Sequence, residues 1–229
     1  MMYFPYFRGR QYDLLALKDI AEQRCLPPNI IPIIEPVRDI RALPQTVAAF
    51  MAANHPLVII ANPTVSDYAL TQQKLHDWHE WANDPNLIVG HILTPTTLPD
   101  DVTPSPDQPT LLIAHHYDEL VAVQHAGWLE TPTYLLVPPE ARVRQLVSRS
   151  SISLFDHAWL PDHDQTYANL VDGFFSDDWV LANLLGYQGV SDYTIGGHYY
   201  SEHGYPAKAV TLHLTYFAGE QLRIHRFVS

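Results

Sequence analysis

At 229 residues, with 47% apolar and 17% charged residues, the chain has the composition of a globular protein and not of a disordered one. Its formal net charge of −12 argues against bulk nucleic-acid binding, which draws on clustered Lys and Arg side chains. The single cysteine excludes an intrachain disulfide and a multi-cysteine zinc site, as is typical of a reducing compartment. We therefore expect one α/β domain over residues 1–229, located in the cytoplasm.

Membrane insertion and secretion are not expected. No apolar run approaches the roughly 20 residues that cross a bilayer, and the N-terminus lacks the charged-then-apolar order of a signal peptide. Cys25 lies near the end of a predicted helix, where we expect a buried and unreactive thiol.

Short apolar runs without polar alternation recur along the chain, as expected of parallel strands that are covered on both faces. The predicted strands are residues 30–37 (IIPIIEPV), 57–62 (LVIIAN), 87–94 (LIVGHILT), 110–115 (TLLIAH), 133–137 (TYLLV) and 151–156 (SISLFD). The predicted helices between them are residues 44–53, 66–81, 118–125, 139–147 and 165–174. This alternation of strand and helix indicates an α/β fold with a parallel sheet.

The last part of the chain has a different pattern. Residues 209–228 alternate with period two around a turn at 218–221, which predicts a β-hairpin. A seventh strand at 191–195 and an eighth strand from the hairpin complete the count for a (β/α)8 TIM-barrel-like domain. The alternative is an open doubly wound parallel sheet, although no glycine-rich phosphate loop follows an early strand.

Parallel strands bring their C-terminal ends to one face, where barrels and open sheets both place their binding sites. The polar residues at these strand ends are Glu35, Asn62, Thr94, His115 and Asp156, together with Asp192 and Tyr193 near the seventh strand. Carboxylates, an imidazole and an amide on one face can bind a polar ligand or a divalent cation. The alternative is that these residues only cap strand ends, because proline follows directly in Glu35-Pro36 and Asn62-Pro63.

No metal site is predicted and no cofactor is assigned. The chain has 13 histidines, but none of their pairs has a specific zinc-binding spacing, and no G-x-S-x-G elbow occurs. The aromatic-rich residues 189–205 (GVSDYTIGGHYYSEHGY) are interpreted as a lid or binding loop, with an ordinary packed loop as the alternative.

Two stretches of the chain resemble the beta-protein family, an uncharacterised group of bacterial and phage proteins. The first is residues 3–17 (YFPYFRGRQYDLLAL) followed by residues 30–37, and the second is residues 189–229. The family has no established activity, so the resemblance implies no catalytic roles, but its motifs include Arg8, Glu35, Asp192 and Tyr193. It also implies a phage-related or defence setting, and relatives that continue past Ser229 with a final helix absent from this chain.

Two functions are compatible with these observations. The first is binding of a small polar or anionic ligand at the strand-end face, with Arg8 holding an anion. Glu35, His115 and Asp156 would then act as hydrogen-bonding or acid/base groups, and the residues leave open whether catalysis follows. The second is a non-catalytic interaction module, whose aromatic C-terminal hairpin docks a protein partner or pairs with another copy of the chain.

Overall fold

The computed structural model describes most of the chain, and this described part contains eleven β-strands and four α-helices. The described residues are 1–66, 81, 83–94, 108–125, 129, 133–147, 152–155, 171–193, 200 and 211–228. The strands are β1 (Met2–Phe7), β2 (Ile33–Ile34), β3 (Leu57–Ile60), β4 (Leu87–Ile92), β5 (Thr110–Ile113), β6 (Tyr134–Val137), β7 (Ile152–Phe155), β8 (Asp172–Ser176), β9 (Gly189–Tyr193), β10 (Thr211–Ala218) and β11 (Gln221–Val228). The α-helices are α1 (Gln11–Glu22), α2 (Ala42–Ala53), α5 (Tyr117–His125) and α6 (Asp178–Leu184), and η2 (Val143–Gln145) is a short 3-10 helix.

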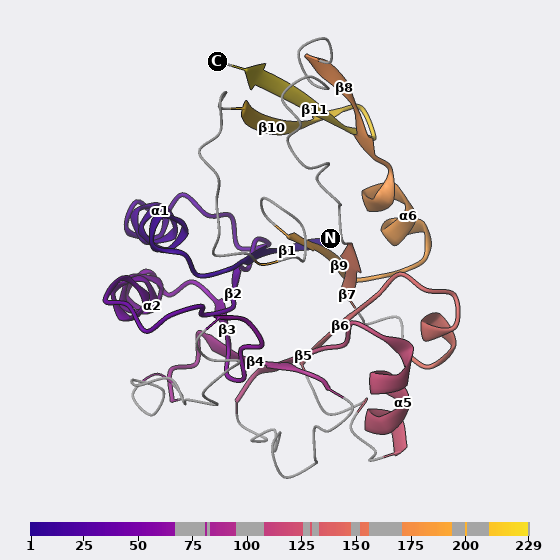
Figure 1. Cartoon of the computed structure of the whole chain (residues 1–229), viewed down its shortest axis with the longest axis horizontal. Helices are drawn as coiled ribbons and strands as arrows, with labels where there is room; N and C mark the ends of the chain where they lie inside the picture. Colours follow the sequence, from indigo (N-terminus) through magenta and orange to yellow (C-terminus); the bar gives the residue numbers. More distant parts are fainter. Residues whose placement is uncertain are drawn as a thin grey trace.

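Eight of the strands form one parallel sheet that curls into a barrel (Figure 1). Their order is β1-β2-β3-β4-β5-β6-β7-β9, and β9 also pairs with β1, from Met2 opposite Gly189 to Tyr6 opposite Tyr193. An open sheet would end in two edge strands, whereas β1 here has a parallel partner on each side. The predicted α/β class and parallel barrel-like sheet are therefore confirmed.

The strand that completes the barrel is not the predicted one. The sequence pattern assigned the eighth strand to the C-terminal hairpin, but β10 and β11 belong to a separate antiparallel sheet. The eighth barrel strand is β1, which was not predicted because Pro5 interrupts its short apolar run and proline normally argues against an interior strand.

The helix predictions are confirmed only in part. Residues 44–53 and 118–125 lie within α2 and α5, as predicted. Residues 139–147 contain only η2, and the helix predicted at 165–174 is wrong at its end, because β8 begins at Asp172. Most of the helix predicted at 66–81 lies outside the described residues, and α6 was not predicted.

Two apolar layers position the strand ends. Alternate strand residues point into the barrel and form its inner core: Phe4, Tyr6, Ile31, Ile33, Val58, Ile60, Ile88, Ile92, Leu111, Ile113, Leu136 and Tyr193. The intervening residues of the strands face outward, where one cluster packs on α1 and α2 and another packs on α5 and α6. Burial on both faces explains the continuous apolar runs, and each fully buried large side chain contributes about 1.5–3 kcal/mol.

The helices α1 and α2 lie side by side outside the first strands (Figure 1). Between them the buried hydroxyl of Thr46 lies 2.9 Å from the carbonyl oxygen of Leu14 and 2.8 Å from that of Ala42. Cys25, which was expected to be buried, is exposed because it lies in the loop beyond the end of α1. In the part of the chain that the structure describes, no helix has both the length and the apolar character needed to cross a membrane.

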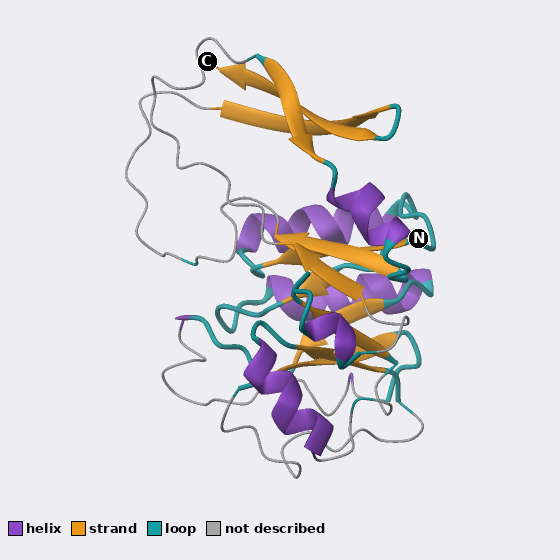
Figure 2. Ribbon diagram, turned by 90° about the vertical axis from the view of Figure 1, so that its right-hand side faces the viewer, coloured by secondary structure: helices purple, strands orange, loops and turns teal. Residues whose placement is uncertain are grey.

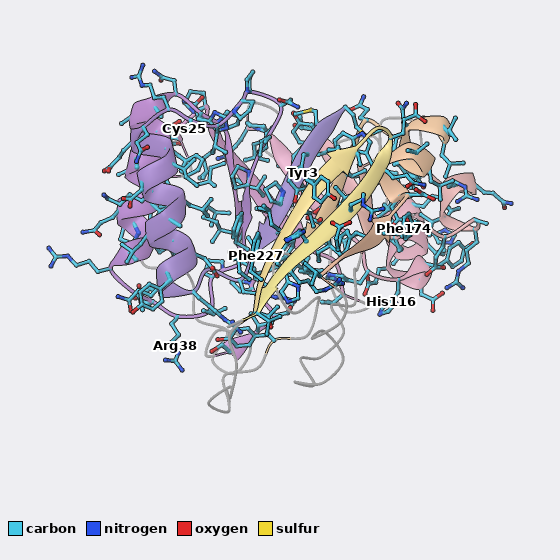
Figure 3. All side chains as sticks on the ribbon, turned by 90° about the horizontal axis from the view of Figure 1, so that it is seen from above. Tyr3, Cys25, Arg38, His116, Phe174 and Phe227 are labelled. Atoms are coloured by element: carbon cyan, nitrogen blue, oxygen red, sulfur yellow. The ribbon has the colours of Figure 1, made fainter. Side chains whose placement is uncertain are left out.

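The second sheet is antiparallel, has the order β10-β11-β8, and lies beside the β1 and β9 wall of the barrel (Figure 2). Residues that pair across antiparallel strands share a face. On the side toward the barrel, Ile224 is only 1% exposed and Phe217 contacts the ring of Trp179 in α6. The opposite side carries exposed apolar side chains, two of which, Phe174 and Phe227, are labelled in Figure 3.

Candidate functional site

The alternation of side chains along the strands determines which polar residues reach the mouth of the barrel. In β1, Phe4 and Tyr6 point inward, so the next inward position is Arg8. In β2 the inward residue is Ile33, and the next inward position is Glu35. The same count on β3, β5 and β9 gives Asn62, His115 and Tyr193. Arg8, Glu35, Asn62 and His115 form a layer at the C-terminal ends of the strands, beside Tyr193 at the top of the apolar core.

Glu35 is the centre of this layer and is fully buried. Its Oε2 atom accepts a hydrogen bond of 2.6 Å from the Tyr6 hydroxyl and pairs with the Arg8 guanidinium. Its Oε1 atom accepts hydrogen bonds from the main-chain N–H of Thr64 at 2.9 Å and from the Thr64 hydroxyl at 3.1 Å. Both carboxylate oxygens are therefore engaged by protein donors, which suits Glu35 to hold Arg8 in place.

Arg8 lies against two aromatic rings at the mouth. Its guanidinium carbon is 5.3 Å from the ring centre of Tyr6 and 4.9 Å from that of Tyr193. The two rings contact each other, with centres 4.6 Å apart and an interplanar angle of 54°. Cation–π attraction and the ion pair with Glu35 together fix the guanidinium, whose side chain keeps 11% of its surface exposed.

The loop after β1 brings Arg8 and Glu35 together. The N–H of Glu35 donates to the carbonyl of Phe7 at 2.9 Å, which continues the pairing of β1 with β2 past the strand ends. Gly9 then turns the chain toward α1 with a φ of +55°, a conformation that favours glycine. A Cβ atom at Gly9 would lie 2.9 Å from the carbonyl oxygen of Glu35, so the close approach of the two loops also requires glycine.

His115 lies across the mouth from Glu35 and is connected to Tyr193. Its Nε2 atom is 3.1 Å from the Tyr193 hydroxyl. The main-chain N–H groups of His115 and His116 donate to Glu119 at 2.8 and 3.1 Å, and this carboxylate in the first turn of α5 caps the helix and fixes the preceding residues. Burial is the main cause that lowers the pKa of His115 below its usual value, so its imidazole is neutral at pH 7.

Asn62 belongs to the same layer, but both ends of its amide serve the sheet. Its Nδ2 group donates to the carbonyl of Ile92 at 2.8 Å, and its Oδ1 atom accepts from the N–H of Ile92 at 2.9 Å. Asn62 therefore extends the pairing of β3 with β4, which corresponds to the strand-capping alternative noted for the polar residues that precede proline.

The structure does not bring Asp192 to this group. Its neighbours in β9, Ser191 and Tyr193, point into the barrel, so Asp192 points outward and accepts a hydrogen bond of 2.7 Å from the hydroxyl of Tyr3. Asp156 and most of the aromatic-rich segment at 189–205 lie outside the described residues. Arg8, Glu35, His115 and Tyr193 are thus the sequence-selected residues that converge at the mouth.

Three residues of the site were missed in the sequence: Tyr6, Thr64 and Glu119. Tyr6 would have followed from recognising β1 as a strand. Glu119 occupies the third helical position after His116, but a histidine stands where a capping box has Ser or Thr, so this pattern does not identify Glu119 in the sequence. Thr64 has no signal in the sequence either, because its contact with Glu35 depends on how the loop after β3 folds over the mouth.

The converging residues supply a guanidinium that is paired with a carboxylate, and a neutral imidazole beside a phenol hydroxyl. In the described ranges, no group of three or more His, Cys, Asp or Glu side chains gathers as metal ligands. Comparison with known proteins finds no matching family model, no matching curated protein and no matching solved structure. The function therefore has to be inferred from the geometry of the mouth.

Proposed function

We propose that the mouth of the barrel binds a small anionic ligand through Arg8. The observation that carries this proposal is the fixed guanidinium group, which Glu35 pairs with and which lies against the rings of Tyr6 and Tyr193. A guanidinium presents planar N–H donors that match the oxygens of a phosphate or a carboxylate. Because the Arg8 side chain is already held in place, anion binding costs little additional side-chain entropy.

His115 completes the proposed site. Its neutral imidazole and the hydroxyl of Tyr193 lie 3.1 Å apart on the same layer as Arg8. A neutral imidazole can accept a proton from a bound ligand or donate a hydrogen bond to it, which suits a polar molecule larger than a simple ion. The proposed ligand class is accordingly a small phosphorylated or carboxylated molecule.

The proposal extends to the type of fold and to the family. We propose that the barrel is of the (β/α)8 type, in which ligands bind at the C-terminal ends of the strands, and that the chain belongs to the beta-protein family. The support is local: Arg8 and Glu35 come from the N-terminal stretch that resembles the family, and Tyr193 comes from the C-terminal stretch. The proposed anion site is thus built from both stretches.

Thermal unfolding in the presence of three probes tests anion binding: inorganic phosphate, glucose 6-phosphate and the tricarboxylate citrate. A probe at 100 times its Kd stabilises the folded chain by about 2.7 kcal/mol, which raises Tm by about 5–10 °C for a chain of this length. The proposal requires such a shift with at least one probe. If none of the three probes raises Tm at concentrations up to about 10 mM, which covers ligands with a Kd in the millimolar range, the proposal of anion binding is refuted.

A pair of matched variants locates the site. Arg8→Lys keeps the charge but loses the planar donors, so it should weaken binding of the active probe by roughly tenfold. Arg24→Lys makes the same substitution at an exposed residue beyond the end of α1 and should bind like the unmodified chain. Equal binding by the two variants would show that the anion binds somewhere other than the mouth.

A second candidate function is self-association through the C-terminal sheet. One face of this sheet carries large apolar side chains that are exposed to solvent: Leu212 at 62%, Leu214 and Phe174 at 55%, and Phe227 at 51%. The strand β10 is also an edge of the sheet, so its main chain can pair with another strand. A second copy of the chain offers both a matching edge and a matching apolar face.

Sedimentation velocity over a range of protein concentrations tests this second function. Leu212→Lys should shift a concentration-dependent dimer to monomer, because it introduces a charge into the apolar face. Leu184→Lys is the control, since this leucine of α6 is 78% exposed and lies outside the sheet. A chain that stays monomeric at all concentrations, or a dimer that Leu212→Lys leaves intact, would contradict self-association through this face.

A further inference from the structure

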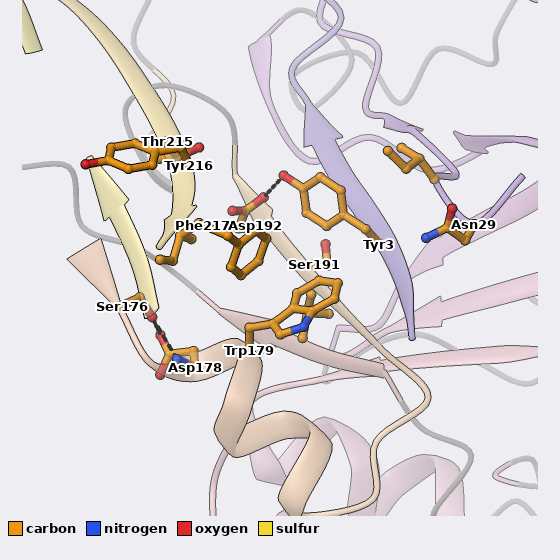
Figure 4. Close-up of a pocket in the computed structure, with 13 residues that line it drawn as sticks. Tyr3, Asn29, Ser176, Asp178, Trp179, Ser191, Asp192, Thr215, Tyr216 and Phe217 are labelled. Carbon is orange, nitrogen blue, oxygen red and sulfur yellow. Dashed lines mark hydrogen bonds between the residues drawn. The ribbon is translucent and has the colours of Figure 1, made fainter. Parts of the chain in front are cut away.

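A cavity lies outside the barrel, between its wall and the C-terminal sheet (Figure 4). Its walls come from β1 and β9 of the barrel, from the residues before β2, from α6, and from β8, β10 and β11 of the C-terminal sheet. The volume of the cavity is about 370 Å³, which is near the lower end of the range for small-molecule sites. The mouth of the barrel contributes none of its lining residues, so the two sites are separate.

Four aromatic residues from three elements line this cavity: Tyr3 from β1, Trp179 from α6, and Tyr216 and Phe217 from β10. Trp179 contacts two of these rings, with ring centres 6.5 Å from Tyr3 and 5.7 Å from Phe217. Both contacts are edge-to-face with interplanar angles of 68°. Rings at such angles turn faces of different orientation toward one space, which is how aromatic cages surround a cation.

The charges of the lining all have the same sign. Asp178 and Asp192 supply two carboxylates, and no Lys, Arg or His is among the described residues that line the cavity. The hydroxyl of Tyr3 donates to Asp192 at 2.7 Å (Figure 4), and burial together with this carboxylate raises the pKa of Tyr3 well above its usual value. Tyr3 therefore stays a neutral donor, and the negative charge resides on the aspartates.

We infer that this cavity binds a trimethylammonium group. Aromatic faces attract a cation, and two carboxylates add a favourable field, so an anion or a neutral polar group is a poorer occupant. The apolar side chains of Ile30, Val190 and Leu222 complete the lining. Asp178 and Asp192 can accept from a primary ammonium group, but the N–H groups that face these apolar side chains would lose water without gaining an acceptor. The methyl groups of a quaternary ammonium pack against the same side chains and need no acceptors.

Two sources carry this chemistry: a free small molecule such as choline, and a trimethylated lysine side chain on a peptide. Titration of the full chain with choline, followed by tryptophan fluorescence and calorimetry, is expected to give saturable binding. The neutral carbon isostere 3,3-dimethylbutanol has the same shape without the charge. It is expected to bind at least tenfold more weakly, because it lacks the cation–π and carboxylate interactions. Equal binding of choline and the isostere would overturn the inference.

Matched substitutions on the two faces of β10 and β11 locate the site. Phe217→Leu removes a ring that lines the cavity, and Phe227→Leu removes a ring of similar exposure, 51% against 53%, from the opposite face. The first should weaken choline binding roughly three- to thirtyfold and the second should leave it unchanged. Asp192→Asn keeps an acceptor for Tyr3 but removes the charge, and it should weaken binding about tenfold.

Peptides distinguish the two sources. A peptide with trimethyl-lysine that binds at least tenfold more tightly than choline identifies a peptide ligand, and weaker binding identifies a free cation. An unmodified lysine peptide should bind to neither the chain nor its variants. No saturable binding of choline or the trimethyl-lysine peptide to the folded chain would overturn the inference. Arg8→Lys should leave choline binding unchanged, because Arg8 lies outside this cavity. The test of choline binding is therefore independent of the test of anion binding at the mouth, and either proposal can be refuted without the other.

Discussion

Replacing Glu35 by glutamine should destabilise the chain far more than a typical substitution. The glutamine side chain keeps an oxygen for Thr64 but turns an N–H2 group toward the Tyr6 hydroxyl and the Arg8 guanidinium, where the carboxylate accepted two hydrogen bonds. Arg8 would then be a largely buried cation that has lost the carboxylate of Glu35, because only 11% of its side chain is exposed. Breaking a buried ion pair on one side costs about 3–5 kcal/mol.

Partial exposure of Arg8 lets water compensate in part, so we expect a loss near the lower end, about 3 kcal/mol. For a chain of 150–250 residues this corresponds to a fall in Tm of about 6–12 °C. Urea unfolding followed by far-UV circular dichroism gives the same quantity as a shift of the midpoint at constant slope.

A double-mutant cycle separates the ion pair from other effects. Arg8→Met removes the cation, and the combination with Glu35→Gln removes both charges of the ion pair. The combined cost should therefore be smaller than the sum of the single costs by about 2 kcal/mol. Additive costs, agreeing within about 0.5 kcal/mol, would show that Arg8 and Glu35 are not coupled and would refute the reasoning.

Two further predictions concern the sheet. Burial lowers the pKa of His91 in β4 from 6.5 to about 4. The unfolding free energy should therefore fall by about 3 kcal/mol as the pH falls from 6.5 to 4. The His91→Gln variant should lack this fall, so the same dependence of unfolding free energy on pH in both proteins would contradict the prediction. Gly189→Ala places a Cβ atom 2.7 Å from the carbonyl oxygen of Met2, where β9 meets β1, and should cost about 1–3 kcal/mol. Gly173→Ala in β8 meets no atom within 4 Å and should cost less than about 1 kcal/mol, so similar urea midpoints for the two variants would argue against the close approach.

The barrel strands that the sequence predicts well are those with a continuous apolar run. Residues 57–62, 87–94 and 110–115 contain β3, β4 and β5, because strands buried on both faces have no polar alternation. The hairpin at 209–228 has the opposite pattern, with period two, which is typical of a sheet that is exposed on one face. This pattern is incompatible with an interior barrel strand, and it explains why β10 and β11 form a separate sheet.

Residues of the candidate site could be predicted from a strand only where the end of that strand was itself predicted. Arg8 was selected from the N-terminal stretch that resembles the family, because β1 was not predicted as a strand. Glu35, His115 and Tyr193 follow from one rule, that side chains alternate along a strand and the mouth lies at its C-terminal end. The same rule separates Asp192 from Tyr193, because neighbours in a strand point to opposite sides. The bonds of Glu35 to Tyr6 and Thr64 could not be predicted, since they depend on the register of β1 against β2 and on a loop conformation.

The pairing of β1 with β9 also constrains how the chain folds as it is made. Of the barrel strands, β1 leaves the ribosome first, and its partner at Gly189 to Tyr193 leaves it last. Until then, β1 has only β2 as a neighbour, and the other edge of the nascent sheet is open to intermolecular pairing. Completion of the barrel is therefore a late, long-range step, and any fragment that ends before β9 retains two unpaired edges.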